Sequence, residues 1–183
     1  MSTATEADLL AQSPDGPFFE LIDGQLVPKA SSFAVSLAKA RLPGLLWKVD
    51  GHRGDWWLLI GIYVRLGDHI LRPDLAGWRR ESLPVLPPDD EEVMALRPDW
   101  VCEVLTPGQT PADLVHKMSL CLHCQIPFYW IIDPQEEKLS VYSFGEEGYT
   151  LVQAAQRGDR LHPKPFDEVE LDVGAIFAED EDE

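Results

Sequence analysis

Glu103 is the residue whose position most strongly suggests chemistry. It lies in the otherwise apolar segment 100–105 (WVCEVL), and its same-face neighbours in a strand are Val101 and Leu105. Burying a carboxylate is costly unless a cation, a metal ion or a proton compensates its charge. The structural alternative is that Glu103 lies at the open end of a strand and pairs with an arginine. The sequence alone leaves both interpretations open.

Lys117 lies in the next segment, 112–125, whose pattern predicts a helix that begins near Pro111. Apolar residues cover most of the circumference of this helix, so we do not expect the lysine to extend freely into water. Asp113 precedes Lys117 by one helical turn. The structural alternative is an ion pair between these two residues, worth only about 0.2–0.5 kcal/mol.

Asp74 is the third candidate, and it follows Pro73 in the predicted strand 69–78. Because proline lacks a backbone donor, we expect this strand to be an edge or to bulge there. An ordinary acid at the entry to a loop is the structural alternative. Two carboxylates on adjacent strands can hold a hard divalent cation, and a nearby lysine can orient or deprotonate a water. The three residues together therefore predict hydrolysis of phosphodiester bonds.

The elements that must position these residues follow from the hydrophobic pattern. The sequence predicts a helix at 31–48, with a serine N-cap and with Pro43-Gly44 expected to end or kink it, and a second helix at 112–125. The predicted strands are a pair within 18–27 around Asp23-Gly24, and then 55–65, 69–78, 100–105, 128–132, 139–144 and 149–153. A long loop is predicted over 79–95. The mixed order of strands and helices predicts an α/β domain with a mixed sheet.

The length and charge of the chain limit the classes of function. The chain has 183 residues, which fits one folded domain, and we place this domain at 17–177. Residues 1–16 are predicted to form an arm or a short helix, and residues 178–183 an acidic disordered tail. The formal net charge of −17 excludes a basic protein that coats nucleic acid and a polybasic membrane-surface protein.

Contact with a phosphate backbone would have to be local in so acidic a chain. Arg65, Arg72, Arg79 and Arg80 flank Asp74 in the sequence and are predicted to form a basic rim beside it. A bound divalent cation would also invert the local field.

The cysteines and the apolar runs indicate where the chain resides. An odd count of three cysteines does not make a disulfide framework, so we expect a reducing cytoplasm. The start of the chain lacks the pattern of a secretory signal, and no apolar run is long enough to span a bilayer. Cys121 and Cys124 lack a second pair, so no structural zinc site is predicted.

Four segments of the sequence resemble the Uma-two family. They are 18–27 (FFELIDGQLV), 72–78 (RPDLAGW), 98–117 (PDWVCEVLTPGQTPADLVHK) and 126–144 (IPFYWIIDPQEEKLSVYSF), and the resemblance extends over residues 15–178. Members of this family are abundant in bacteria and are assigned to the PD-(D/E)xK nuclease superfamily. The resemblance implies a restriction-endonuclease-like core, with a mixed β-sheet flanked by helices. It also implies a magnesium-dependent or manganese-dependent endonuclease acting on nucleic acid, with DNA as the expected partner.

The family pattern can be carried over to individual residues. Asp74 matches the acid of the PD motif, and Glu103 matches the acid of the second motif. The superfamily often places its lysine two residues after that acid, where this chain has Leu105. In the Uma-two pattern the lysine comes instead from the following helix in a D-x-x-x-K arrangement, which Asp113 and Lys117 match.

The resemblance also implies a role for each site residue. Asp74, Glu103 and the backbone carbonyl of Val104 would bind the metal, while Lys117 would position and activate the water. Asp113 would orient Lys117, and Glu20 would be an acid that helps to hold the metal through water. The chain departs from the family pattern at several positions. Gly108-Gln109 replace Ser-Thr, Cys121 replaces Tyr, Gln125 replaces Gly and Phe128 replaces Glu. The histidine that the family usually has early in the first long helix is missing.

Two functions of different classes follow. The first is a metal-dependent endonuclease, expected to act as a homodimer. The second is a catalytically inactive module that keeps the nuclease fold to bind protein or nucleic acid. The geometry discriminates between them, because the first requires Asp74, Glu103 and Lys117 to converge on one site.

Overall fold

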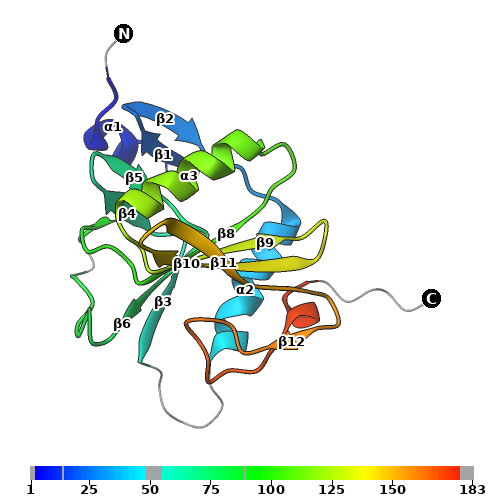
Figure 1. The fold of residues 1–183 in the computed structure, drawn as a ribbon. Coiled ribbons are helices and arrows are strands. Elements are labelled where there is room, and N and C mark those ends of the chain that lie inside the picture. The colour runs from blue at the N-terminus through cyan, green and yellow to red at the C-terminus, as the bar shows by residue number, and fades with distance from the viewer. Residues whose placement is uncertain (1–2, 14, 48–54, 89, 178–183) are drawn as a thin grey trace.

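The computed structural model describes residues 3–13, 15–47, 55–88 and 90–177, whose strands form two large sheets and one two-stranded ribbon (Figure 1). The five-stranded sheet has the order β2-β1-β5-β4-β7, made of β1 (Phe19–Ile22), β2 (Gln25–Pro28), β4 (Tyr63–Leu66), β5 (His69–Leu71) and β7 (Val93–Met94). The six-stranded sheet has the order β11-β10-β9-β8-β6-β3, made of β3 (Trp56–Ile60), β6 (Leu75–Arg79), β8 (Trp100–Val104), β9 (Phe128–Asp133), β10 (Lys138–Gly145) and β11 (Gly148–Gln156). The ribbon pairs β12 (Arg160–Leu161) with β13 (Leu171–Asp172).

Helices cover both faces of the six-stranded sheet. The helices are α1 (Glu6–Leu10), α2 (Phe33–Leu46), α3 (Pro111–His123) and the 3-10 helix η1 (Val173–Ile176). On one face α2 and η1 pack over a core that includes Trp100 and Trp130. On the other face α3 and the five-stranded sheet pack over Trp78 and Tyr129. Since β8 and β9 are parallel and the other neighbouring pairs are antiparallel, the predicted α/β domain with a mixed sheet is confirmed.

Strand β8 is the central strand predicted from the apolar segment 100–105. All five of its residues are buried, as expected for a strand covered on both faces. Trp100, Cys102 and Val104 face the core on the α2 side, whereas Val101 faces the core on the α3 side. Alternation along the strand therefore directs Glu103 toward α3 and the five-stranded sheet.

Two predicted strands are each divided in the structure. The segment 55–65 forms β3 and β4, which belong to different sheets, with Gly61 at φ 55° between them. The segment 69–78 forms β5 and β6, again in different sheets, and the division falls at Pro73, where the sequence predicted an edge or a bulge. Both corrections have one cause, because a residue with positive φ and a proline each interrupt a ladder.

The helices begin as predicted, but α2 does not end at its proline. Ser32 caps α2 through its side chain, which accepts a hydrogen bond from the Val35 amide. Pro43 lies inside α2, and the helix continues to Leu46. Leu42 and Leu46 are buried in the core on either side of Pro43, so packing outweighs the lost backbone hydrogen bond.

The remaining segments differ in how far the structure describes them. Helix α1, within the predicted arm, buries Leu9 against the five-stranded sheet. The predicted loop 79–95 carries the short strand β7, which pairs in parallel with β4. The predicted tail, 178–183, lies outside the described residues. Among the described helices, none combines the length and the apolar character needed to cross a membrane.

Candidate active site

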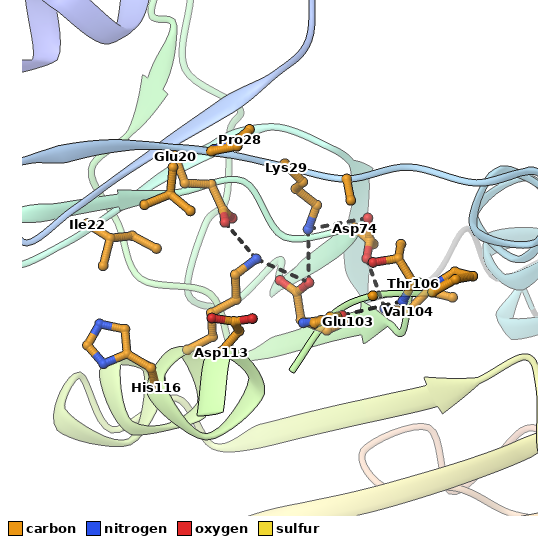
Figure 2. A pocket seen from close by; sticks show the side chains of 16 residues that line it. Glu20, Ile22, Pro28, Lys29, Asp74, Glu103, Val104, Thr106, Asp113 and His116 are labelled. Carbon is orange, nitrogen blue, oxygen red and sulfur yellow. Dashed lines mark hydrogen bonds and ion pairs between the residues drawn. The ribbon is translucent and has the colours of Figure 1, made fainter. Parts of the chain in front are cut away.

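Asp74 and Glu103 face the same pocket from neighbouring strands. In the antiparallel pair of β6 and β8, Leu75 lies opposite Cys102, and the same register continued by one residue places Asp74 opposite Glu103. Both side chains are buried, and both line a cavity of about 370 Å³ between the two sheets and α3. Figure 2 shows the two carboxylates directed into this cavity.

Asp74 is fixed by the backbone of the neighbouring strand. Its Oδ2 accepts a hydrogen bond from the Val104 amide at 2.9 Å. Its Oδ1 is buried and accepts no hydrogen bond from the described residues. The groups that face this oxygen are the ammonium groups of Lys29 and Lys39, at 3.4 and 3.5 Å. One oxygen of the carboxylate therefore holds the side chain in place, and the other is directed at cations.

Lys29 is a site residue that the sequence analysis missed. Its Nζ lies 2.9 Å from Glu103 Oε2 as well as 3.4 Å from Asp74 Oδ1, so it bridges the two acids (Figure 2). Its only sequence signal is a lysine directly after a predicted strand. The contact depends on the pairing of β1 with β5, which brings the end of β2 over the six-stranded sheet and cannot be derived from local pattern.

Lys117 reaches the same cavity from α3. Its Nζ lies 2.6 Å from Glu20 Oε2 and 3.8 Å from Glu103 Oε2. The other oxygen of Glu20 accepts a hydrogen bond from the Arg72 amide at 2.8 Å, which anchors this buried acid. The convergence of Asp74, Glu103 and Lys117, on which the enzyme hypothesis depends, is therefore present.

Asp113 makes contacts other than the predicted ones. Its Oδ2 accepts hydrogen bonds from the Thr110 amide and hydroxyl at 3.0 and 2.7 Å, and this makes it the N3 residue of a capping box. Among the described residues, the ion pairs of Lys117 are with Glu20 and Glu103. The residue in contact with Lys117 is therefore Glu20, and the orienting role expected of Asp113 stays a prediction without a contact to support it.

The charges around the cavity shift the pKa values of the two acids in opposite directions. Burial raises the pKa of Asp74, and the negative charge of Glu103 adds to the rise. Burial also acts to raise the pKa of Glu103, but the positive charges of Lys117 and Lys29 outweigh it, so this pKa lies below its ordinary value. Burial acts to lower the pKa of Lys29, but the surrounding acids raise it above the ordinary value, so Lys29 is an ammonium ion.

The four arginines predicted to form a basic rim beside Asp74 do not line the cavity. Arg65 lies 2.6 Å from Glu6, and the guanidinium of Arg72 lies 3.5 Å from the centroid of the Phe18 ring. The guanidinium groups of Arg79 and Arg80 lie over the rings of Trp56 and Trp57. Sequence proximity to Asp74 was misleading because the chain changes sheets at Pro73, so Arg65 on β4 and Arg79 on β6 belong to different sheets. The cations at the site are Lys29, directly after β2, Lys39 on α2 and Lys117 on α3.

The donor set of the pocket fits a divalent cation of the magnesium type. Such an ion is commonly held by one or two carboxylates and keeps several waters. Asp74 and Glu103 supply the carboxylates, and Asp74 Oδ1 is a buried oxygen to which no hydrogen-bond donor is directed among the described residues. Within the described ranges, no three His, Cys, Asp or Glu side chains form a metal-binding group. Because the two oxygens of Glu20 contact Lys117 and the Arg72 amide, Glu20 would act through water, and Val104, which lines the cavity, would supply main-chain oxygen.

Comparisons with known proteins identify the family and the fold of the chain. The model of the Uma2 family, described as "Putative restriction endonuclease", matches residues 6–174, and the resemblance to the Uma-two family is confirmed. A crystal structure described as a putative nuclease belonging to DUF820, from Anabaena variabilis ATCC 29413, is 22% identical with a TM-score of 0.76. The match covers 94% of this chain and 96% of that chain, and it confirms the restriction-endonuclease-like fold. No curated protein matches the chain.

Proposed function

The chain belongs to the Uma2 family of putative restriction endonucleases, and from this premise we propose that it is a metal-dependent endonuclease that hydrolyses phosphodiester bonds of DNA. One observation carries the proposal: Asp74, Glu103 and Lys117 come from three separate elements and converge on one cavity. Structural ion pairs rarely need two buried acids at opposite positions of neighbouring strands, because the repulsion between them must be compensated.

Each residue of the cavity has a role in the proposed reaction. Asp74 and Glu103 would hold the cation, together with the main-chain carbonyl of Val104. Lys117 donates a hydrogen bond to the attacking water. The ion pair with Glu20 holds the Nζ of Lys117 at 3.8 Å from Glu103 Oε2, within reach of that water. The lysines also attract the phosphate, which is needed in a chain with a net charge of −17. A divalent cation in this position supplies Lewis-acid stabilisation of the charge that develops on the phosphate oxygens.

A catalytically inactive module that binds protein or nucleic acid is the second candidate function. The position of Lys29 favours it, since the lysine already contacts both acids that would hold the cation. In such a module the pocket would be an internal ion-pair network, and the fold would serve for binding alone.

A cleavage assay separates the two candidates. Wild-type protein and Glu103→Ala are incubated at low salt with magnesium or manganese and with single-stranded, duplex and branched substrates of DNA and RNA. The proposal expects metal-dependent cutting by the wild type and none by Glu103→Ala. Binding without cutting by either protein would favour the inactive module.

The proposal also includes the oligomeric state of the protein and its location in the cell. A homodimer is expected, and size-exclusion chromatography with light scattering tests it directly. A cytoplasmic location is supported by Cys102, Cys121 and Cys124, all of which are free thiols.

A further inference from the structure

Lys29 is held rigidly at the centre of the candidate site. Its amide donates a hydrogen bond of 2.7 Å to the Phe18 carbonyl, which fixes the backbone at the end of β2. From there the side chain extends into the cavity and is only 9% exposed (Figure 2). An ordinary surface lysine keeps its ammonium group in water, whereas that of Lys29 lies between two buried acids.

The oxygens that Lys29 contacts are those that a divalent cation would use. Asp74 has one oxygen committed to the Val104 amide, so only Oδ1, which faces Lys29, is available. On Glu103, Oε2 is the atom closest to Lys29, at 2.9 Å. An ammonium group and a divalent cation cannot occupy the same position between these two oxygens, so one must leave before the other binds.

The charges of the cavity also indicate that Lys29 and a divalent cation exclude each other. Three acids, Glu20, Asp74 and Glu103, face three ammonium groups, those of Lys29, Lys39 and Lys117. Within this ion-pair network the formal charges balance without any added ion, and Asp113, the fourth acid that lines the cavity, bonds to Thr110 instead. Removing one ammonium group would leave an excess of negative charge at the two carboxylates, which is the condition that favours a divalent cation.

We propose that Lys29 is a built-in competitor of the divalent cation at Asp74 and Glu103, and that it sets the metal concentration at which the site becomes loaded. This rests on the proposed function and goes beyond it, because it assigns the metal affinity to a residue outside the acid and lysine motifs. At low metal concentration Lys29 keeps the two acids paired. At higher concentration the cation would displace the ammonium group of Lys29 from the two carboxylates, and the freed lysine would be available to a phosphate in the same cavity.

Lys39 provides a matched control. It also lies 3.5 Å from Asp74 Oδ1, but its described ion pair does not include Glu103, and its side chain is 18% exposed. A substitution of Lys39 therefore removes the same charge from the neighbourhood of Asp74 without vacating the position between the two acids.

The test is manganese binding measured by isothermal titration calorimetry on the full chain, without nucleic acid. The proteins are the wild type, Lys29→Met, Lys29→Gln, Lys39→Met and Glu103→Gln, each checked for native circular dichroism. Lys29→Met is expected to bind manganese about tenfold or more tightly than the wild type, because the competing charge is gone. Lys39→Met is expected to gain about threefold at most. If Lys29→Met does not fold, Lys29→Gln shows whether removing the charge of Lys29 tightens manganese binding.

The outcomes separate this inference from the proposed function. Unchanged manganese affinity in the folded Lys29 variants, with binding lost in Glu103→Gln, would overturn the competition and leave the nuclease proposal standing. Binding by the Lys29 variants alone would support the competition and contradict metal-dependent activity of the natural chain. Absence of binding in every protein would overturn both.

Discussion

Lys117 on α3 lies 2.6 Å from Glu20 on β1, and this ion pair ties the helix to the five-stranded sheet across the candidate site. Glu20 is in turn anchored by the Arg72 amide. The position of the lysine thus depends on both sheets and on the helix between them. A lysine that only stabilises a helix pairs with an acid three or four residues away on the same helix, whereas Lys117 pairs with a buried acid on another sheet.

Replacing Lys117 tests its catalytic role. Lys117→Met is expected to lower the cleavage rate by about 100-fold or more while sparing manganese binding, because the lysine positions water and does not hold the metal. Lys138→Met, which removes a lysine paired with Glu136 at the surface, is the control and should leave the rate unchanged. Single-turnover cleavage measures the first effect and calorimetry the second. A Lys117→Met variant as active as wild type would contradict the assignment.

Asp113 is predicted to matter for stability more than for catalysis. Its carboxylate caps α3 through Thr110, so Asp113→Ala and Thr110→Ala should lower the urea midpoint of unfolding by similar amounts. The hydrogen bonds from Thr110 lower the pKa of Asp113, so its contribution is present above the ordinary value of 3.8 and is lost as the pH falls through the folded value. A large loss of cleavage by Asp113→Ala, with no such loss by Thr110→Ala, would restore the role that the resemblance implies.

The backbone of Gln125, directly after the C-cap of α3, is predicted to be strained. The Gln125 amide bonds to the Leu122 carbonyl and the Ile126 amide to the Cys121 carbonyl, which is a Schellman motif, and Gln125 has a φ of 55°. Glycine adopts this conformation without strain, so Gln125→Gly should raise the free energy of unfolding by about 0.5–1 kcal/mol. Gln125→Ala retains the strain and should show no comparable gain. Urea unfolding compares the three proteins.

Buried thiols and phenols predict a loss of stability in alkali. Burial raises the pKa of Cys102 and Cys121 well above 9.0, and that of Tyr129 well above 10.0. The unfolded chain therefore ionises first, so the stability that each group contributes is present below its ordinary pKa and is lost as the pH rises above it, with a slope that approaches about 1.4 kcal/mol per pH unit for each group. Urea unfolding between pH 8 and pH 10 measures this slope. Cys121→Ala should reduce it, and an equal slope in the variant would contradict the assignment.

The residues found from the sequence share a local signal, and those missed depend on distant pairing. Glu103 stood out as a charge within an apolar strand, and Lys117 as a charge on a largely apolar helix. Lys29 has no such signal, because its contacts arise only when β2 is brought over the six-stranded sheet. The divided strands combine both cases: Gly61 and Pro73 are local signals for an interruption, but the placement of the two halves in different sheets depends on distant pairing.

The central claim is that Asp74 and Glu103 form the metal-binding pair of a nuclease. The most direct test follows cleavage of a labelled duplex at low salt over a manganese titration, using wild type, Asp74→Asn and Glu103→Gln, with folding checked by circular dichroism. The account predicts cutting that depends on manganese in the wild type and cutting that is lost in both folded variants. Cutting retained in either variant, or a wild type that does not cut at any manganese concentration, would contradict it.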